Sequence, residues 1–164
     1  KRTPLLGAIN MGGLRAMNLL VPAIWIDRIP DQQLVIIAAA GYGIYILSVT
    51  LLGILEDAPR VQRRTVLGLV SIPPVTVALI LSGATPNPWP AAAIGFLLAG
   101  WLVWRHRAGE WDQGRIRGAM MWLLLGTMIY TGLLALACGR WPEALAILAM
   151  ILPARLIART IALT

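Results

Sequence analysis

The stretch GAINMGGLRAMNLLVPAIWI (residues 7–26) is long and apolar enough to cross a bilayer, yet it carries Arg15 and Asn18 near its middle. A transmembrane helix needs about 20 predominantly apolar residues. Similar stretches recur along the chain of 164 residues, which is 59% hydrophobic and only 13% charged. A soluble domain of this length cannot bury so much apolar surface, so lipid must cover the remainder. We therefore predict an all-α, polytopic transmembrane helical bundle.

Six apolar segments stand out between turn-rich or charged connections. They lie at residues 5–26, 33–55, 65–83, 90–104, 118–138 and 144–162. No connection is long enough for a soluble domain, so residues 1–164 are expected to form a single transmembrane domain. Pro73 and Pro74 in the third segment and Pro153 in the sixth should break or kink their helices. Each interruption is either a packing kink or a break that lines a cavity.

The basic residues fall mostly on one side of this six-span arrangement. When successive spans alternate in direction, eleven of the bases share a face with both termini, and only Arg28 and Arg140 lie opposite. Lys and Arg concentrate on the cytoplasmic side of membrane proteins. We predict a multi-pass protein of the cell membrane with both ends of this segment cytoplasmic. Because the bases punctuate spans rather than cover a soluble face, membrane lipids and not nucleic acid are the expected partners.

Arg15 and Asn18 pose a separate question, because a charge at mid-span is costly. An arginine there costs ~2.5–3.5 kcal/mol on insertion scales, so it persists only with a partner or a wet cavity. The two residues are three apart and share one helical face. Gly12, Gly13 and Ala16 are small enough to let a neighbouring helix approach closely. We predict that Arg15 and Asn18 face the bundle interior; the alternative is that the span is shifted and Arg15 reaches the cytoplasmic interface.

The acidic pair Glu56-Asp57 is the strongest candidate for a functional site, one that binds a metal ion and a phosphate. It closes the second apolar segment and is followed by Arg60, Arg63 and Arg64. Adjacent carboxylates beside guanidiniums can hold a divalent metal and bind a phosphate. The alternative is a solvated helix end whose charges neutralise one another. The sequence contains no P-loop, dinucleotide fingerprint, Cys/His metal spacing or nucleophile–base pair.

Three stretches of the chain resemble the UbiA superfamily of intramembrane prenyltransferases, and its divergent bacterial branch most closely. They are KRTPLLGAINMGGLRAMNLL (residues 1–20), YILSVTLLGILEDAPRVQRRTVLG (residues 45–68) and ILPARLIARTIALT (residues 151–164). The segment at 66–105 matches the family only in hydropathy. The resemblance implies that Lys1 ends a Tyr-x-x-x-Lys motif. The chain would then be the C-terminal part of a UbiA-like bundle, with further helices expected before Lys1.

The resemblance also implies a reaction, the joining of a polyprenyl diphosphate to a lipophilic acceptor. Family members hold Mg²⁺ and the diphosphate with a pair of Asp-rich motifs, of which the first would precede Lys1. The second corresponds to Glu56 and Asp57, although Val61 stands where a further acid is expected. Lys1, Arg15 and Arg60 would then contact the diphosphate, and Asn18 would orient the acceptor. No catalytic residue is assigned, and Mg²⁺ is expected only if the full-length protein is catalytic.

Two other classes of function remain open. A UbiA-like segment that has lost its acidic motifs can be a non-catalytic structural or lipid- or pigment-binding subunit of a larger membrane complex. A transporter or channel subunit is a third class, but Arg15 is the only charge at depth, and coupling sites need acids or more ionisable groups. Because Glu56 and Asp57 stand beside three arginines, we expect this segment alone to bind Mg²⁺ weakly and to lack transferase activity.

Overall fold

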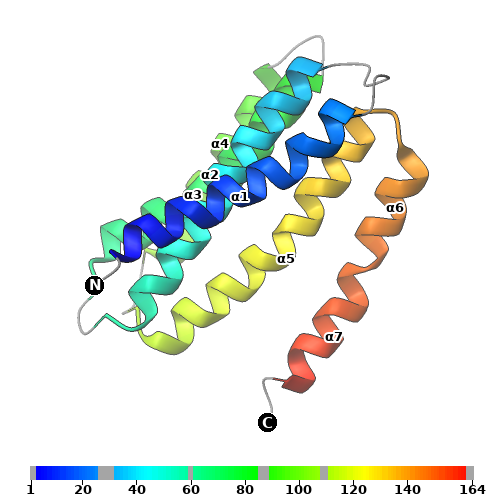
Figure 1. Ribbon diagram of the computed structural model, residues 1–164. Coiled ribbons are helices and arrows are strands. Elements are labelled where there is room, and N and C mark those ends of the chain that lie inside the picture. Colours follow the sequence, from blue (N-terminus) through cyan, green and yellow to red (C-terminus); the bar gives the residue numbers. More distant parts are fainter. Residues whose placement is uncertain (1–2, 26–31, 59–60, 85–88, 108–110, 162–164) are drawn as a thin grey trace.

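The structure is a computed structural model that describes residues 3–25, 32–58, 61–84, 89–107 and 111–161 (Figure 1). These residues are almost entirely helical, and no strand occurs among them. The helices are α1 (Pro4–Trp25), α2 (Gln32–Glu56), α3 (Arg63–Ala84), α4 (Trp89–His106), α5 (Gln113–Ala137), α6 (Trp141–Ala149) and α7 (Ile151–Ile161). The predicted all-α class is confirmed.

Each predicted apolar segment forms a helix, and the sixth is divided into α6 and α7. Within the described parts of the chain, three helices are long and apolar enough to cross a membrane: Gln33–Glu56, Arg63–Gly83 and Gln113–Ala137. A shorter apolar helix covers Phe96–Arg105. A membrane protein is therefore indicated by helix length and composition, and the count of six spans stays a prediction.

The helix α2 lies at the centre of the bundle. It packs against α1, α3 and α5, while α3 also packs against α4 and α5. Beyond α5, the pair α6 and α7 forms an outer arm that contacts α5 (Figure 1). Among the described helices, the backbone of α1 lies close only to that of α2, and the backbone of α4 only to that of α3. Much of the surface of α1 and α4 is consequently left for lipid or for another protein.

Small residues bring α1 and α2 into backbone contact. Ala8 and Gly12 are buried on α1. A Cβ atom added to Gly12 would lie 2.7 Å from the carbonyl oxygen of Gly43 on α2, and one added to Gly43 would lie 3.1 Å from Ala16 Cβ. Glycine at both positions therefore sets the helix spacing, as in other small-residue contacts between membrane helices.

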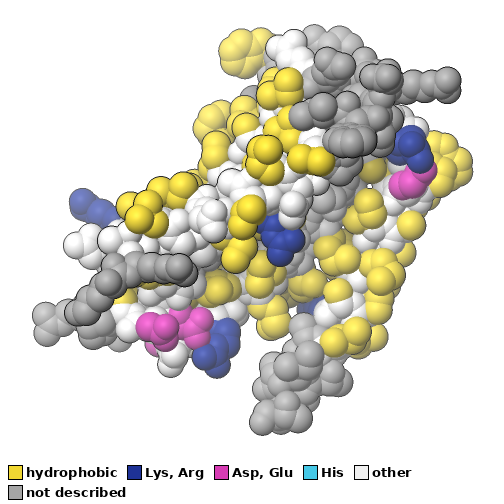
Figure 2. Space-filling view, viewed as in Figure 1, with side chains coloured by type: hydrophobic (Ala, Val, Ile, Leu, Met, Phe, Trp, Pro, Cys, Tyr) yellow, Lys and Arg dark blue, Asp and Glu magenta, His cyan; other side chains and the backbone are white. Residues whose placement is uncertain are grey.

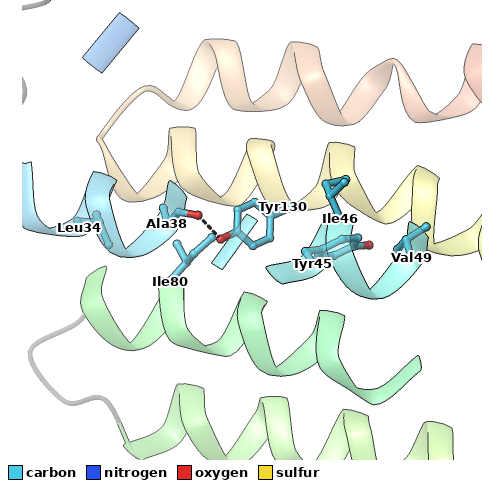
Figure 3. Packing of buried hydrophobic residues seen from close by; sticks show 7 residues of the cluster. All are labelled: Leu34, Ala38, Tyr45, Ile46, Val49, Ile80 and Tyr130. Atoms are coloured by element: carbon cyan, nitrogen blue, oxygen red, sulfur yellow. Dashed lines mark hydrogen bonds between the residues drawn. The ribbon is translucent and has the colours of Figure 1, made fainter. Parts of the chain in front are cut away.

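Two tyrosines join α2 to α5 in the core (Figure 3). Tyr45 donates a hydrogen bond of 2.5 Å to the carbonyl oxygen of Leu123, and Tyr130 donates one of 2.6 Å to that of Ala38. Their rings meet edge-on with centroids 5.8 Å apart. Because each hydroxyl reaches the backbone of the opposite helix, both polar groups are satisfied within the bundle.

The prolines of α3 leave that helix continuous, whereas the helix of the sixth apolar segment is interrupted near its proline. α3 continues as a helix across Pro73 and Pro74, so a break there is not found. Near them, Thr76 Oγ1 donates to the carbonyl oxygen of Pro73 at 2.8 Å. In the sixth segment, Met150 separates α6 from α7, three residues before Pro153. Proline lacks an N–H and opposes the carbonyl four residues earlier, so the predicted break is confirmed there.

The chain reverses between α5 and α6 through a left-handed glycine. Gly139 has φ = 73°, a conformation that other residues rarely adopt. Arg140 follows and pairs with Glu143 in the first turn of α6. The hydrogen bond from Arg140 lowers the pKa of the Glu143 carboxyl group. This exposed ion pair lies beside the connection between α5 and α6, at the end of the bundle opposite Glu56 and Asp57.

Candidate functional site

A cavity of about 410 Å³ lies where α2 ends and α5 begins. Its lining includes the carboxylates of Glu56, Asp57 and Asp112, together with Trp111 and Ile116. Figure 2 shows acidic side chains beside a basic one at the lower left, at this end of the bundle. The volume falls in the range of ~300–1,000 Å³ that is common for ligand pockets.

An apolar cluster beneath the cavity holds the two helix ends together. Leu52 of α2, Val66 and Val70 of α3, and Ile116 of α5 are all buried and in mutual contact. Asp112 caps α5, because its Oδ1 accepts a hydrogen bond of 2.8 Å from the backbone N–H of Arg115. Such a cap satisfies a free N–H and places negative charge at the positive end of the helix dipole.

Glu56 is paired with an arginine that the sequence did not single out. Arg117 Nη2 lies 2.7 Å and Nε lies 3.0 Å from Glu56 Oε1. The Glu56 side chain is only 17% exposed, whereas Arg117 is 70% exposed. The topology predicted that both residues share one end of the bundle, but 61 residues separate them in sequence. The charge neutralisation considered for this helix end is present, with Arg117 as the partner.

The residues predicted to hold Mg²⁺ are Glu56 and Asp57. In the part of the chain that the structure describes, no group of three or more His, Cys, Asp or Glu side chains is placed to hold a metal ion. One Glu56 oxygen accepts from Arg117, and Asp112 caps a helix. Mg²⁺ prefers octahedral oxygen coordination, so these residues alone do not fit a metal site. Metal binding stays a prediction.

Arg15 and Asn18 are exposed on α1. The prediction that they face the interior is therefore wrong for the bundle that this chain forms. α1 contacts α2 through Gly12, and at about 100° per residue Arg15 points about 60° and Asn18 about 120° away from that contact. The contact made by Gly12 is with Gly43, which lies thirteen residues before Glu56. Along the helix this is about 20 Å, so Arg15 does not join the acidic cavity.

The other two predicted substrate-binding residues, Lys1 and Arg60, lie outside the residues that the structure describes. Their roles stay predictions. The structure thus brings Glu56 and Asp57 together in one cavity and places Arg15 and Asn18 elsewhere.

A second cavity, of about 610 Å³, opens between α3, α4 and α5. Its lining includes Val70, Trp101, Arg105, Arg115 and Trp122. Sequence reasoning missed it because three helices contribute. One signal was visible: Trp101 and Arg105 are four residues apart, and Arg115 and Trp122 are seven apart, so each pair shares a helical face.

Comparison with known proteins produced no match, whether to a family model, to a curated protein or to a solved structure. The UbiA resemblance accordingly rests on the three stretches of sequence quoted above.

Proposed function

We propose that the chain is the C-terminal part of a UbiA-like membrane protein, and that this part is non-catalytic. In this proposal its helices form six spans of the cell membrane with both ends cytoplasmic, and the bundle serves as a structural or lipid-binding part of a larger membrane assembly. The eleven bases on one face support the orientation. The length and composition of α2, α3 and α5 support the spans.

The ion pair between Glu56 and Arg117 carries the non-catalytic proposal. The resemblance assigns the Glu56 carboxylate to metal binding. In the structure this carboxylate accepts hydrogen bonds from Nε and Nη2 of Arg117, which belongs to α5. Both hydrogen bonds reach the same oxygen, Oε1, and each is assisted by the opposite charges of the two groups. Glu56 thus joins α2 to α5, while Asp112 caps the first turn of α5 itself.

Prenyl transfer by the complete protein is the second candidate, and one observation favours it. Asp57 lines the 410 Å³ cavity and is exposed, at the position where the resemblance places the second acidic motif. In such an enzyme Mg²⁺ would neutralise the diphosphate as it leaves. Lys1 and Arg60, which lie outside the described residues, would be the cationic donors to the diphosphate. Arg15 and Asn18 are too far from this cavity along α1 to share that role. The remaining metal ligands would have to come from outside the described residues.

Turnover by the complete natural protein separates the two candidates. The protein is reconstituted in nanodiscs and given radiolabelled farnesyl diphosphate, Mg²⁺ and a bacterial lipid extract as acceptor. The non-catalytic proposal expects no release of diphosphate above the protein-free rate. It also expects Glu56→Gln to lower stability slightly, because Arg117 loses the negative charge of its partner.

The variant Asp57→Asn supplies the decisive comparison. Asp57 is exposed, so its replacement should leave the unfolding midpoint unchanged. Turnover in the natural protein that falls at least tenfold in Asp57→Asn, with normal stability, would establish the enzyme and overturn the non-catalytic proposal.

A further inference from the structure

Arg15 and Asn18 lie exposed on α1, which is at the outside of the bundle (Figure 1). Neither side chain has a hydrogen-bond or ion-pair partner among the described residues. The face around them is otherwise apolar and includes Met11 and Leu14, whose side chains are also exposed. An apolar surface of this kind belongs against lipid or protein and not in water.

The packing of α1 on α2 sets the depth of these polar groups. Gly12 and Ala16 meet Gly43, which lies near the middle of α2. Because α2 is long and apolar enough to cross a membrane, its middle would lie about 15 Å from either surface of the hydrocarbon core. Arg15 is next to Ala16 in the sequence and shares this level. An ionisable side chain at such a depth almost always faces protein and pairs with another polar group.

The chain itself does not supply an opposite charge at this depth. Its seven acidic residues all lie in connections or at the ends of the apolar segments: Asp27, Asp31, Glu56, Asp57, Glu110, Asp112 and Glu143. A second copy of the chain would therefore bring only an apolar helix or another Arg15 to this face. A lipid phosphate lies at the membrane surface and not at mid-depth. The complementary group is a carboxylate within the hydrocarbon core, and a transmembrane helix is the structure that can carry one there.

The exposed residues around Arg15 form a stripe along which a helix can pack. Gly7, Met11, Arg15 and Asn18 are successively four, four and three residues apart, and all are exposed. At about 100° per residue they fall within about 80° of one another around α1. Residues at such spacings form the seam between paired helices. A Cβ atom added to Gly7 would meet nothing within 4 Å, so the stripe is open at this glycine.

We propose that this stripe docks a transmembrane helix of another subunit, and that the docked helix carries an aspartate or glutamate near its centre. The carboxylate accepts hydrogen bonds from the Arg15 guanidinium, and the Asn18 amide bonds to a polar group of the same helix. Gly7 lets the two backbones approach closely. The inference rests on the proposed function, because it names the chemistry of the partner in the larger membrane assembly.

Binding of synthetic transmembrane peptides tests the proposal. The chain, with a donor dye at its C-terminus, is reconstituted in phosphatidylcholine vesicles, and binding of acceptor-labelled peptides is followed by energy transfer. The peptides are helices of about 20 leucine and alanine residues. They differ only at one central position, which is glutamate, glutamine or lysine.

The glutamate peptide should bind at least about tenfold more tightly than the glutamine peptide, because the loss of one partner from a buried charge pair costs that much or more. The lysine peptide should not bind. Arg15→Gln should abolish the preference for glutamate. Asn18→Ala should weaken binding by about threefold, the equivalent of one interhelical hydrogen bond. Gly7→Leu should weaken it by filling the stripe.

Three matched variants should bind the glutamate peptide as the unmodified chain does. Arg63→Gln removes an exposed charge at the beginning of α3. Asn10→Ala removes an exposed amide that lies about 80° around α1 from Asn18. Gly13→Leu enlarges a glycine that also has nothing within 4 Å but lies about 120° around the helix from Gly7.

Equal binding of the glutamate and glutamine peptides, or a glutamate preference that persists in Arg15→Gln, would overturn the proposal. An equal loss of binding in the matched variants would do the same. Energy transfer between donor-labelled and acceptor-labelled copies of the chain that Arg15→Gln abolishes would make a second copy the occupant. A chain that does not enter the vesicles would refute the membrane insertion in the proposed function, whereas a chain that inserts and shows no glutamate preference would refute only the docking site.

Discussion

Replacing Gly41 by alanine should destabilise the bundle by an amount that depends on a single hydroxyl group. An added Cβ atom would lie 2.7 Å from Tyr130 Oη but 3.8 Å from Tyr130 Cζ. The first distance is a clash and the second is an ordinary contact. Tyr130 is fully buried, and its hydroxyl is 2.6 Å from the carbonyl oxygen of Ala38. The hydroxyl can therefore move away only by giving up that hydrogen bond.

The expected free energies follow from these distances. Overpacking a core costs ~1–3 kcal/mol, and Gly→Ala within a helix returns ~0.5–1 kcal/mol. Gly41→Ala should therefore lower the free energy of unfolding by up to about 2.5 kcal/mol. Tyr130→Phe removes one interhelical hydrogen bond, worth ~0.6 kcal/mol on average and up to ~1.7. In the Tyr130→Phe background the clash is gone, so Gly41→Ala should be neutral or stabilising by up to ~1 kcal/mol.

The assay is a double-mutant cycle followed by denaturant unfolding of all four proteins in detergent micelles, with circular dichroism as the signal. Gly68→Ala is the matched control, because a Cβ atom there meets nothing within 4 Å. It should not lower stability in either background. If Gly41→Ala costs the same with tyrosine and with phenylalanine at position 130, then the hydroxyl contact is not what requires glycine, and this reasoning is refuted.

Three further predictions concern topology, activity and the ion pair. With Cys138 replaced by alanine, single cysteines in the loops at 84–90 and 108–114 should react with an impermeant reagent from opposite sides of the membrane; labelling from the same side would contradict the six-span topology. Residues 1–164 alone should show no turnover of a polyprenyl diphosphate and only weak Mg²⁺ binding by calorimetry, because one of two adjacent carboxylates is neutralised; measurable turnover would refute this. A double-mutant cycle of Glu56→Gln and Arg117→Gln should give a coupling energy of at most about 1 kcal/mol, since Arg117 is largely exposed; a coupling of several kcal/mol would mean that the pair is desolvated.

The candidate site was only partly predictable. Glu56 and Asp57 could be located because both lie at the end of an apolar segment, which hydropathy defines locally. For the bundle that this chain forms, the prediction that Arg15 and Asn18 face the interior was wrong, because their spacing fixes a shared face but not the direction in which it points. That direction depends on which side of α1 meets α2. Here the side is set by Gly12 and Gly43, whose close approach no single-helix pattern reveals.

The sequence by itself determined the helices, since their bounds follow from long apolar segments, from charged connections and from the effect of Pro153 on its own helix. These features act within a few residues along the chain. The tertiary structure alone decided which groups meet. Arg117 pairs with Glu56, the Tyr130 hydroxyl donates to the carbonyl oxygen of Ala38, and α3, α4 and α5 together line the second cavity. In a lipid environment apolarity does not distinguish one helix face from another. Helix pairing therefore depends on small residues and a few polar contacts, whose match is settled only when the helices meet in space.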